Sequence, residues 1–193
     1  MRLARSVAAS MAQPSPHGTA STSTIRGRVA AGAVLDWRPE PLISVGGSDH
    51  RIDTRLDVAA TAQLVWLDEI VLGRHGEQPG RVTSRLRVSV DDEVALDHEI
   101  VAGSGALRGA GANGSFRVLA SAVVLGQPQP SRSPIITPTC RAAALACAGR
   151  ATLFSGVAST RDELAAAFAA LGLREPAKLT AARRRAVVAH PIR

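Results

Sequence analysis

Three side chains around a glycine-rich turn are of the types that hold metal ions. Glu69 and Glu77 offer carboxylates, and His75 between them offers an imidazole. Imidazole and carboxylate ligands suit divalent borderline metals such as nickel. Because the spacing is loose, a solvated hairpin turn is the alternative interpretation, and the spacing alone favours it.

Glu69 also follows Asp68 near the end of a stretch, QLVWLDEIVL (63–72), that is apolar on both faces. Such a pattern is typical of a strand covered on both sides, so one of the two carboxylates points into a covered layer. A buried carboxylate costs on the order of several kcal/mol unless it is paired, and Arg74 is the nearest cation in the sequence. The sequence therefore predicts either a structural clamp or a partner-facing turn built from Glu69, Arg74 and Glu77.

The standard catalytic motifs are missing from the sequence. GAGANG (109–114) matches the dinucleotide pattern G-x-G-x-x-G, but a strand-like segment follows where that pattern needs a helix. No nucleophile elbow, Walker loop or His-Glu-x-x-His motif is present. His98 lies on an apolar strand face, which is typical of a hydrogen-bonded core histidine. We therefore expect no enzymatic activity and no tightly bound cofactor.

Charge leaves one binding alternative open. The 193 residues carry a formal charge of +7, which suits an anionic partner. The arginines are spread along the chain except for Arg183, Arg184 and Arg185, which make nucleic acid or another anion the alternative ligand. No apolar run approaches the ~20 residues that span a membrane, and the N-terminus lacks a signal-peptide core. The leading expectation is a cytoplasmic protein that binds neither nucleic acid nor membrane.

An internal repeat indicates how the elements that carry these residues are stacked. Residues 25–40 align with residues 54–69 at an offset of 29, and eight of sixteen positions are identical. Each copy has the pattern strand, tight turn, strand, which is typical of stacked supersecondary units. The identical pairs are Arg26/Arg55, Val29/Val58, Ala30/Ala59, Ala31/Ala60, Ala33/Ala62, Leu35/Leu64, Trp37/Trp66 and Glu40/Glu69.

Period-two alternation predicts a hairpin after the repeat. Alternate residues are apolar in both VTSRLRVSV (82–90) and EVALDHEIV (93–101). A one-residue slip would turn one of the two apolar faces to the opposite side. The faces coincide when Val90 lies opposite Val94, which leaves residues 91–93 as the loop.

The remaining segments complete a single domain over residues 1–193. A Gly-rich loop (103–115) and a Pro-rich connection (127–139) flank one further strand (116–125). The pattern becomes helical over residues 159–189.

Within that helical part, Thr160 and Glu163 form a capping box, and apolar residues follow at helical spacing until Gly172. KLTAARRRAVV (178–188) favours a second short helix. The predicted fold class is therefore mainly β, with stacked sheet layers and one or two C-terminal α-helices.

Two linked motifs carry a family resemblance. GAVLDWRPEPLI (32–43) has a Gly-Ala-x-Leu-x-Trp-x-Pro-x-Pro pattern, and RLDVAATAQLVWLDEIVLGRHGE (55–77) has an Ala-x-Leu strand followed by Glu, Gly-Arg and Glu. The matching residues are Gly32, Ala33, Leu35, Trp37, Pro39, Pro41, Ala62, Leu64, Glu69, Gly73, Arg74 and Glu77. In these features the chain, best over residues 25–101, resembles the urease accessory protein UreD family, called UreH in some organisms.

The resemblance implies a helically wound β fold and a nonenzymatic role. Proteins of this family assemble with UreF-like and UreG-like accessory proteins, dock on the urease apoprotein and help insert nickel, so nickel is expected in transit. The resemblance also implies that Glu69, Arg74 and Glu77 shape a partner-facing turn or line a polar path for the ion. Family members usually begin with an earlier Gly-Gly-Asp segment and strand pair, so we expect a truncated or divergent short member.

Overall fold

Thirteen strands, one 3-10 turn and one α-helix make up the described part of the chain, which comprises residues 2–4, 9–105, 116–126 and 132–174 of the computed structural model. One sheet contains β3 (Ser21–Val29), β6 (Asp49–Val58), β8 (Arg81–Val90) and β9 (Glu93–Gly103). The larger sheet contains β1 (Arg2–Ala4), β2 (Ser10–Ala12), β4 (Val34–Trp37), β5 (Leu42–Ser44), β7 (Gln63–Leu72), β10 (Val118–Leu125), β11 (Ile135–Ile136), β12 (Cys140–Ala146) and β13 (Ala151–Ala158). The helical elements are η1 (Ala148–Arg150) and α1 (Arg161–Leu171).

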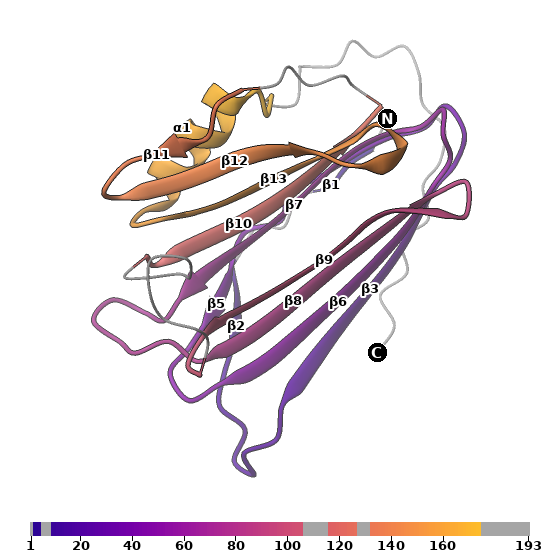
Figure 1. Cartoon of the computed structure of the whole chain (residues 1–193). Coiled ribbons are helices and arrows are strands. Elements are labelled where there is room, and N and C mark those ends of the chain that lie inside the picture. Colours follow the sequence, from indigo (N-terminus) through magenta and orange to yellow (C-terminus); the bar gives the residue numbers. More distant parts are fainter. Residues whose placement is uncertain (1, 5–8, 106–115, 127–131, 175–193) are drawn as a thin grey trace.

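The two sheets lie face to face, and α1 covers the outer side of the larger one at β12 and β13 (Figure 1). The smaller sheet has the order β3-β6-β8-β9, and the main path of the larger sheet is β1-β4-β7-β10-β13-β12-β11. β5 pairs with β7, and β2 pairs with β5. The predicted fold class, mainly β with stacked layers and a C-terminal helix, is confirmed.

The repeat is realised as parallel pairing in register. β3 lies beside β6 with Arg26 opposite Arg55, and β4 lies beside β7 with Trp37 opposite Trp66. The two indole rings stack with their centroids 4.9 Å apart and their planes 9° apart. Identical residues of the two copies therefore lie directly on top of one another, and the chain winds alternately through the two sheets.

β7 has the two covered faces that its sequence predicts. Leu64, Trp66, Ile70 and Leu72 lie in the apolar core between the sheets. Residues on the opposite face, such as Val65, pack against a separate core beneath α1. Alternation along the strand thus sends every second side chain into a different layer.

The hairpin between β8 and β9 departs from its predicted register only near the turn. Val90 lies opposite Glu93 rather than Val94, and the loop contains only Asp91 and Asp92. Both loop residues have positive φ, 46° and 68°, which suits the twist of a tight two-residue hairpin.

A β-bulge restores the predicted register beyond this turn. The irregularity lies between Val88 and Ser89, and from there on Val88 lies opposite Leu96, as expected from the apolar pattern. The bulge absorbs the extra residue, so the apolar faces still coincide along most of the hairpin. Val94 is left 44% exposed, which corrects its predicted place on the buried face.

The C-terminal helix follows its sequence signals closely. The Thr160 hydroxyl accepts from the Glu163 backbone N–H while the Glu163 carboxylate accepts from the Thr160 N–H, and Gly172 ends the helix at a φ of 108°. The predicted second helix (178–188), the GAGANG stretch (109–114) and the arginine cluster (183–185) lie outside the described residues. Among the residues that the structure describes, no helix has the length and apolar character needed to cross a membrane.

Candidate functional site

The turn after β7 is closed by an ion pair between Arg74 and Glu77. Arg74 donates from Nη2 to Oε1 at 3.0 Å and from Nε to Oε2 at 3.1 Å, and its backbone N–H reaches Oε2 at 2.9 Å. These bonds hold the pKa of Glu77 down at about 2. Gly73 has a φ of 72°, and a Cβ there would come within 2.9 Å of the Glu77 carbonyl oxygen, so the turn requires glycine.

Two neighbouring segments of the chain hold the backbone of this turn in place. Arg117 donates from Nη2 to the carbonyl oxygens of Arg74 and Glu77, both at 2.9 Å. The N–H of Gly73 donates to the Ser44 carbonyl oxygen at 2.8 Å. The turn is therefore a preformed surface feature, with the Arg74 side chain 64% exposed at its outer edge.

Glu69 does not join this turn, which corrects the predicted pairing with Arg74. Its partner is Arg161, the first residue of α1, which donates from Nε to Oε1 at 2.6 Å and from Nη2 to Oε2 at 3.2 Å. Alternation along β7 directs Glu69 to the α1 side, whereas Arg74 lies beyond the strand end. The Glu69 side chain is only 12% exposed.

The repeat supplies a second carboxylate to the same arginine. Nη2 of Arg161 lies 3.5 Å from Oε2 of Glu40, which occupies the position of Glu69 in the first copy. Together the two glutamates raise the pKa of the arginine, chiefly through the hydrogen bonds that Arg161 donates to Glu69. Glu69 thus anchors the start of the helix to the stacked repeat.

The three candidate metal ligands therefore do not form one site. Glu69 binds Arg161, Glu77 binds Arg74, and His75 is exposed and makes no hydrogen bond or ion pair with a described residue. Within the described ranges, no group of three or more His, Cys, Asp or Glu side chains is arranged to hold a metal ion. A contact between nickel and Glu69, His75 or Glu77 stays a prediction.

Asp68 takes the opposite direction and faces the layer between the sheets. Its neighbours on the same face of β7 are Trp66 and Ile70, both in the intersheet core. Burial raises the pKa of Asp68 to about 6, and the Trp66 indole acts weakly in the other direction. The indole Nε1 of Trp66 nevertheless has no partner of good hydrogen-bond geometry among the described residues. Unlike Glu69, this carboxyl makes no ion pair with a described residue.

Other polar side chains continue this layer across the two sheets. Ser121 on β10 lies opposite Asp68, and its hydroxyl is 3.3 Å from Nε2 of His98 on β9. Burial lowers the pKa of His98 and thereby favours its neutral imidazole. Thr54 on β6 is fully buried, and its hydroxyl has no partner among the described residues. Leu86 lies between Thr54 and His98 in the strand register, so we call only Asp68, Ser121 and His98 the polar belt.

The polar belt is the part of the site that sequence patterns identify least well. The alternation of Leu64, Trp66, Asp68 and Ile70 contains the signal that Asp68 shares the intersheet face. Ser121 has no such signal, because every residue of β10 is buried. The Asp68 carboxylate and the His98 imidazole, both next to Ser121, are of the ligand types that divalent borderline metals accept.

The stacked repeat, the fastened turn and the polar belt define a β-layered protein with a preformed exposed turn. A family model described as UreD urease accessory protein matches residues 3–190. The chain therefore belongs to the UreD urease accessory protein family.

Named relatives agree with this assignment. A urease accessory protein UreD from Streptomyces avermitilis is 44% identical over 110 residues, which are 55% of this chain and 43% of the relative. UreD from Frankia casuarinae is 40% identical over 142 residues, 67% of this chain and 44% of the relative. UreD 3 from Streptomyces griseus is 39% identical over 162 residues, 79% of this chain and 62% of the relative. The chain thus spans less than two thirds of these relatives.

Proposed function

We propose that this chain is a nonenzymatic urease maturation factor of the cytoplasm. It assembles with UreF-like and UreG-like accessory proteins and with the urease apoprotein, and nickel is its cargo. Membership of the UreD family supports the role in urease maturation. The turn of Arg74 and Glu77, held in place before any partner arrives, supports a docking role for that edge.

The observation that carries the proposal is the unpaired carboxyl of Asp68 in the intersheet layer. A carboxylate that faces an apolar layer without a cation costs stability, and a strongly perturbed group of this kind is a candidate for a functional site. Asp68 offers oxygen ligands beside the hydrogen-bonded pair of Ser121 and His98. A carboxylate and an imidazole alone hold a divalent ion weakly. Weak binding suits an ion that is passed on to another protein.

Protons compete with the ion at this carboxyl. Because the pKa of Asp68 is about 6, the carboxyl is largely ionised above that pH and increasingly protonated below it. Nickel transfer through the polar belt should therefore fall as the pH drops through 6.

The test is co-expression of the chain with UreF-like and UreG-like partners and apo-urease, with Asp68→Asn as the variant and Asp162→Asn on the exposed start of α1 as the matched control. Asp68→Asn keeps the size of the side chain and removes its charge. We expect normal co-purification of the complex and a fall in urease activation of about tenfold or more. The control should match the unsubstituted chain.

Two results would contradict the proposal at different points. Full urease activation with Asp68→Asn would remove the polar belt from the nickel path and leave the assembly role standing. Failure of the unsubstituted, folded chain to co-purify with any of these partners would refute the assembly role itself.

A further inference from the structure

The exposed face of the smaller sheet carries three arginines in one row. Arg26 on β3 lies opposite Arg55 on β6, which lies opposite Arg87 on β8. Neighbouring strands are ~4.8 Å apart, so the three guanidinium groups follow a line across the strands. We call Arg26, Arg55 and Arg87 the arginine row. Asp97 on β9 comes next in the same register.

The carboxylates around the arginine row do not neutralise it. Like charges directly opposite one another on neighbouring strands are destabilising. Arg55 has Asp53 at 3.1 Å, and Arg87 has only a distant pair with Asp97 at 3.8 Å. Arg26 makes no ion pair or hydrogen bond with a described residue.

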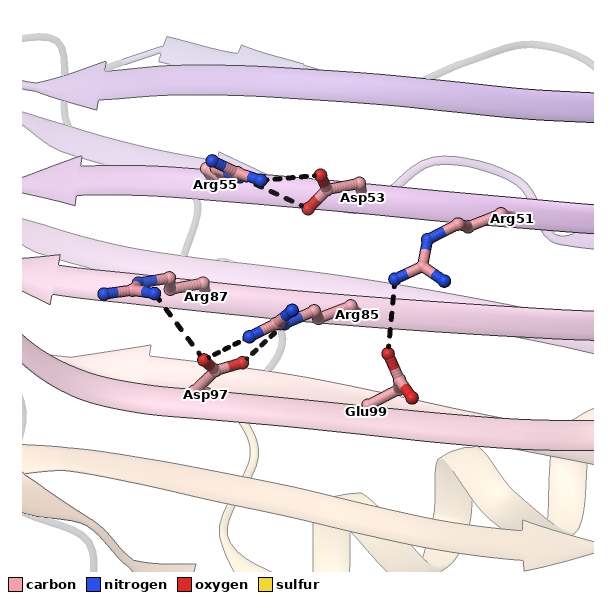
Figure 2. Close-up of polar contacts among 7 residues, drawn as sticks. All are labelled: Arg51, Asp53, Arg55, Arg85, Arg87, Asp97 and Glu99. Carbon is pink, nitrogen blue, oxygen red and sulfur yellow. Dashed lines mark hydrogen bonds and ion pairs between the residues drawn. The ribbon is translucent and has the colours of Figure 1, made fainter.

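Asp97 is engaged mainly by another arginine. Arg85 donates to both of its oxygens, at 2.8 and 2.7 Å, and this pairing lowers the pKa of Asp97. Figure 2 shows Arg85 and Arg87 of β8 converging on this single carboxylate. The arginine row therefore keeps positive charge to offer to a partner.

The acidic residues interspersed among the arginines indicate which kind of partner can bind. Asp53, Asp97 and Glu99 lie among the arginines, and Glu99 pairs with Arg51 at 3.4 Å (Figure 2). These carboxylates would repel a uniform polyanion such as nucleic acid. The outward positions of β6, β8 and β9 also carry no aromatic side chain on which a base could stack.

A protein helix with separate carboxylates fits the row better. On an α-helix, residues three and four positions apart have Cβ atoms about 5–6 Å apart. That spacing is close to the ~4.8 Å between strands, whereas alternate residues of an extended chain lie about 6.8 Å apart. Successive acidic residues of one helix face can therefore meet successive arginines.

We propose that the outer face of β3, β6 and β8 binds an acidic α-helix of a protein partner. The helix lies across the strands, and its Glu or Asp carboxylates pair with Arg26, Arg55 and Arg87. Side chains in this row are accessible, since those of Arg55 and Arg87 are 50% and 44% exposed. This inference stands on the sheet face alone and is independent of the polar belt.

The test uses a labelled helical peptide with Glu on one face at positions three and four apart, and its Gln counterpart, in fluorescence anisotropy at low salt. The variant is the triple Arg26→Gln/Arg55→Gln/Arg87→Gln. Its matched control removes three exposed arginines elsewhere, Arg132→Gln/Arg150→Gln/Arg174→Gln. We expect the Glu peptide alone to bind, the row variant to lose about tenfold or more in affinity, and the control to stay within about twofold.

A charge swap keeps the test decisive if the triple variant folds poorly. Arg55→Glu should weaken binding of the Glu peptide. It should strengthen binding of a peptide whose central Glu is replaced by Lys. The proposal is overturned if the Glu peptide does not bind the unsubstituted chain. It is overturned as well if the row variant and the control lose the same amount of affinity for this peptide. It is also overturned if a single-stranded DNA of equal charge binds more tightly than the Glu peptide.

Discussion

Two adjacent carboxylates of β7, those of Asp68 and Glu69, differ in whether a cation pairs with them. Glu69 faces α1 and receives a two-pronged hydrogen bond from Arg161, whereas Asp68 faces the other sheet and pairs with no described cation. The first arrangement is what a structural carboxylate requires, since its charge is compensated. The second costs stability, because no described cation compensates the charge. Burial alone does not distinguish the two, but partnership does.

We expect the largest difference between the two carboxylates in the pH dependence of stability, which Asp68 should dominate. Its pKa is raised in the folded chain to about 6, above its unfolded value, so the folded state binds more protons in between. Stability should therefore fall as the pH rises from about 4 through 6, by about 2–3 kcal/mol. Asp68→Asn should remove this fall and stabilise the chain at pH 8. Urea unfolding at pH 5 and pH 8 measures both, and an unchanged pH profile would contradict the buried ionisation.

A middle-sized effect is expected from the other side of the strand. Glu69→Gln weakens the anchor of α1 and leaves Arg161 without its main partner. Because Arg161 is half exposed, the loss should be only about 1–2 kcal/mol in the free energy of unfolding. Thermal unfolding measures it, with Glu99→Gln on the exposed sheet face as control. A loss no larger than that of the control would show that Glu69 is not structural.

The smallest effect belongs to the exposed turn. The pKa of Glu77 is held at about 2 by Arg74, so the stability that this pair contributes is present above the unfolded pKa and is lost as the pH falls toward 2. Glu77→Gln should lower the melting temperature less than Glu69→Gln does at pH 7, and the effect of Glu77→Gln should fade as the pH drops toward 2. A larger shift for Glu77→Gln would mean that the turn, rather than the helix anchor, stabilises the fold.

Much of the fold could be predicted because its signals are local or repeated. Identical residues in two copies of a unit indicate strands stacked in register, and Arg26 with Arg55 shows that geometry. The capping box of Thr160 and Glu163 likewise depends on neighbours in sequence. β12 has no such signal, since its alanine-rich sequence disfavours strands, and only pairing with β13 beneath α1 makes it one.

The site could be predicted only in part, for a related reason. Sequence patterns show that either Asp68 or Glu69 faces a covered layer, but the partner of Glu69 lies 92 residues further along the chain. Nearness in sequence therefore suggested Arg74, whose own partner is three residues away. The link between Ser121 and His98 likewise joins two sheets and depends on the packing of the whole chain.

The stacked indoles of Trp37 and Trp66 are the chain's only two tryptophans. All of its indole fluorescence and its indole circular dichroism therefore originate at the contact between the two copies of the repeat. Parallel rings at 4.9 Å couple their electronic transitions, so the coupled signal is lost once the copies separate. The two tryptophans thus report optically on the stacking of the repeat. Trp66 lies two residues before Asp68, on the same face of β7.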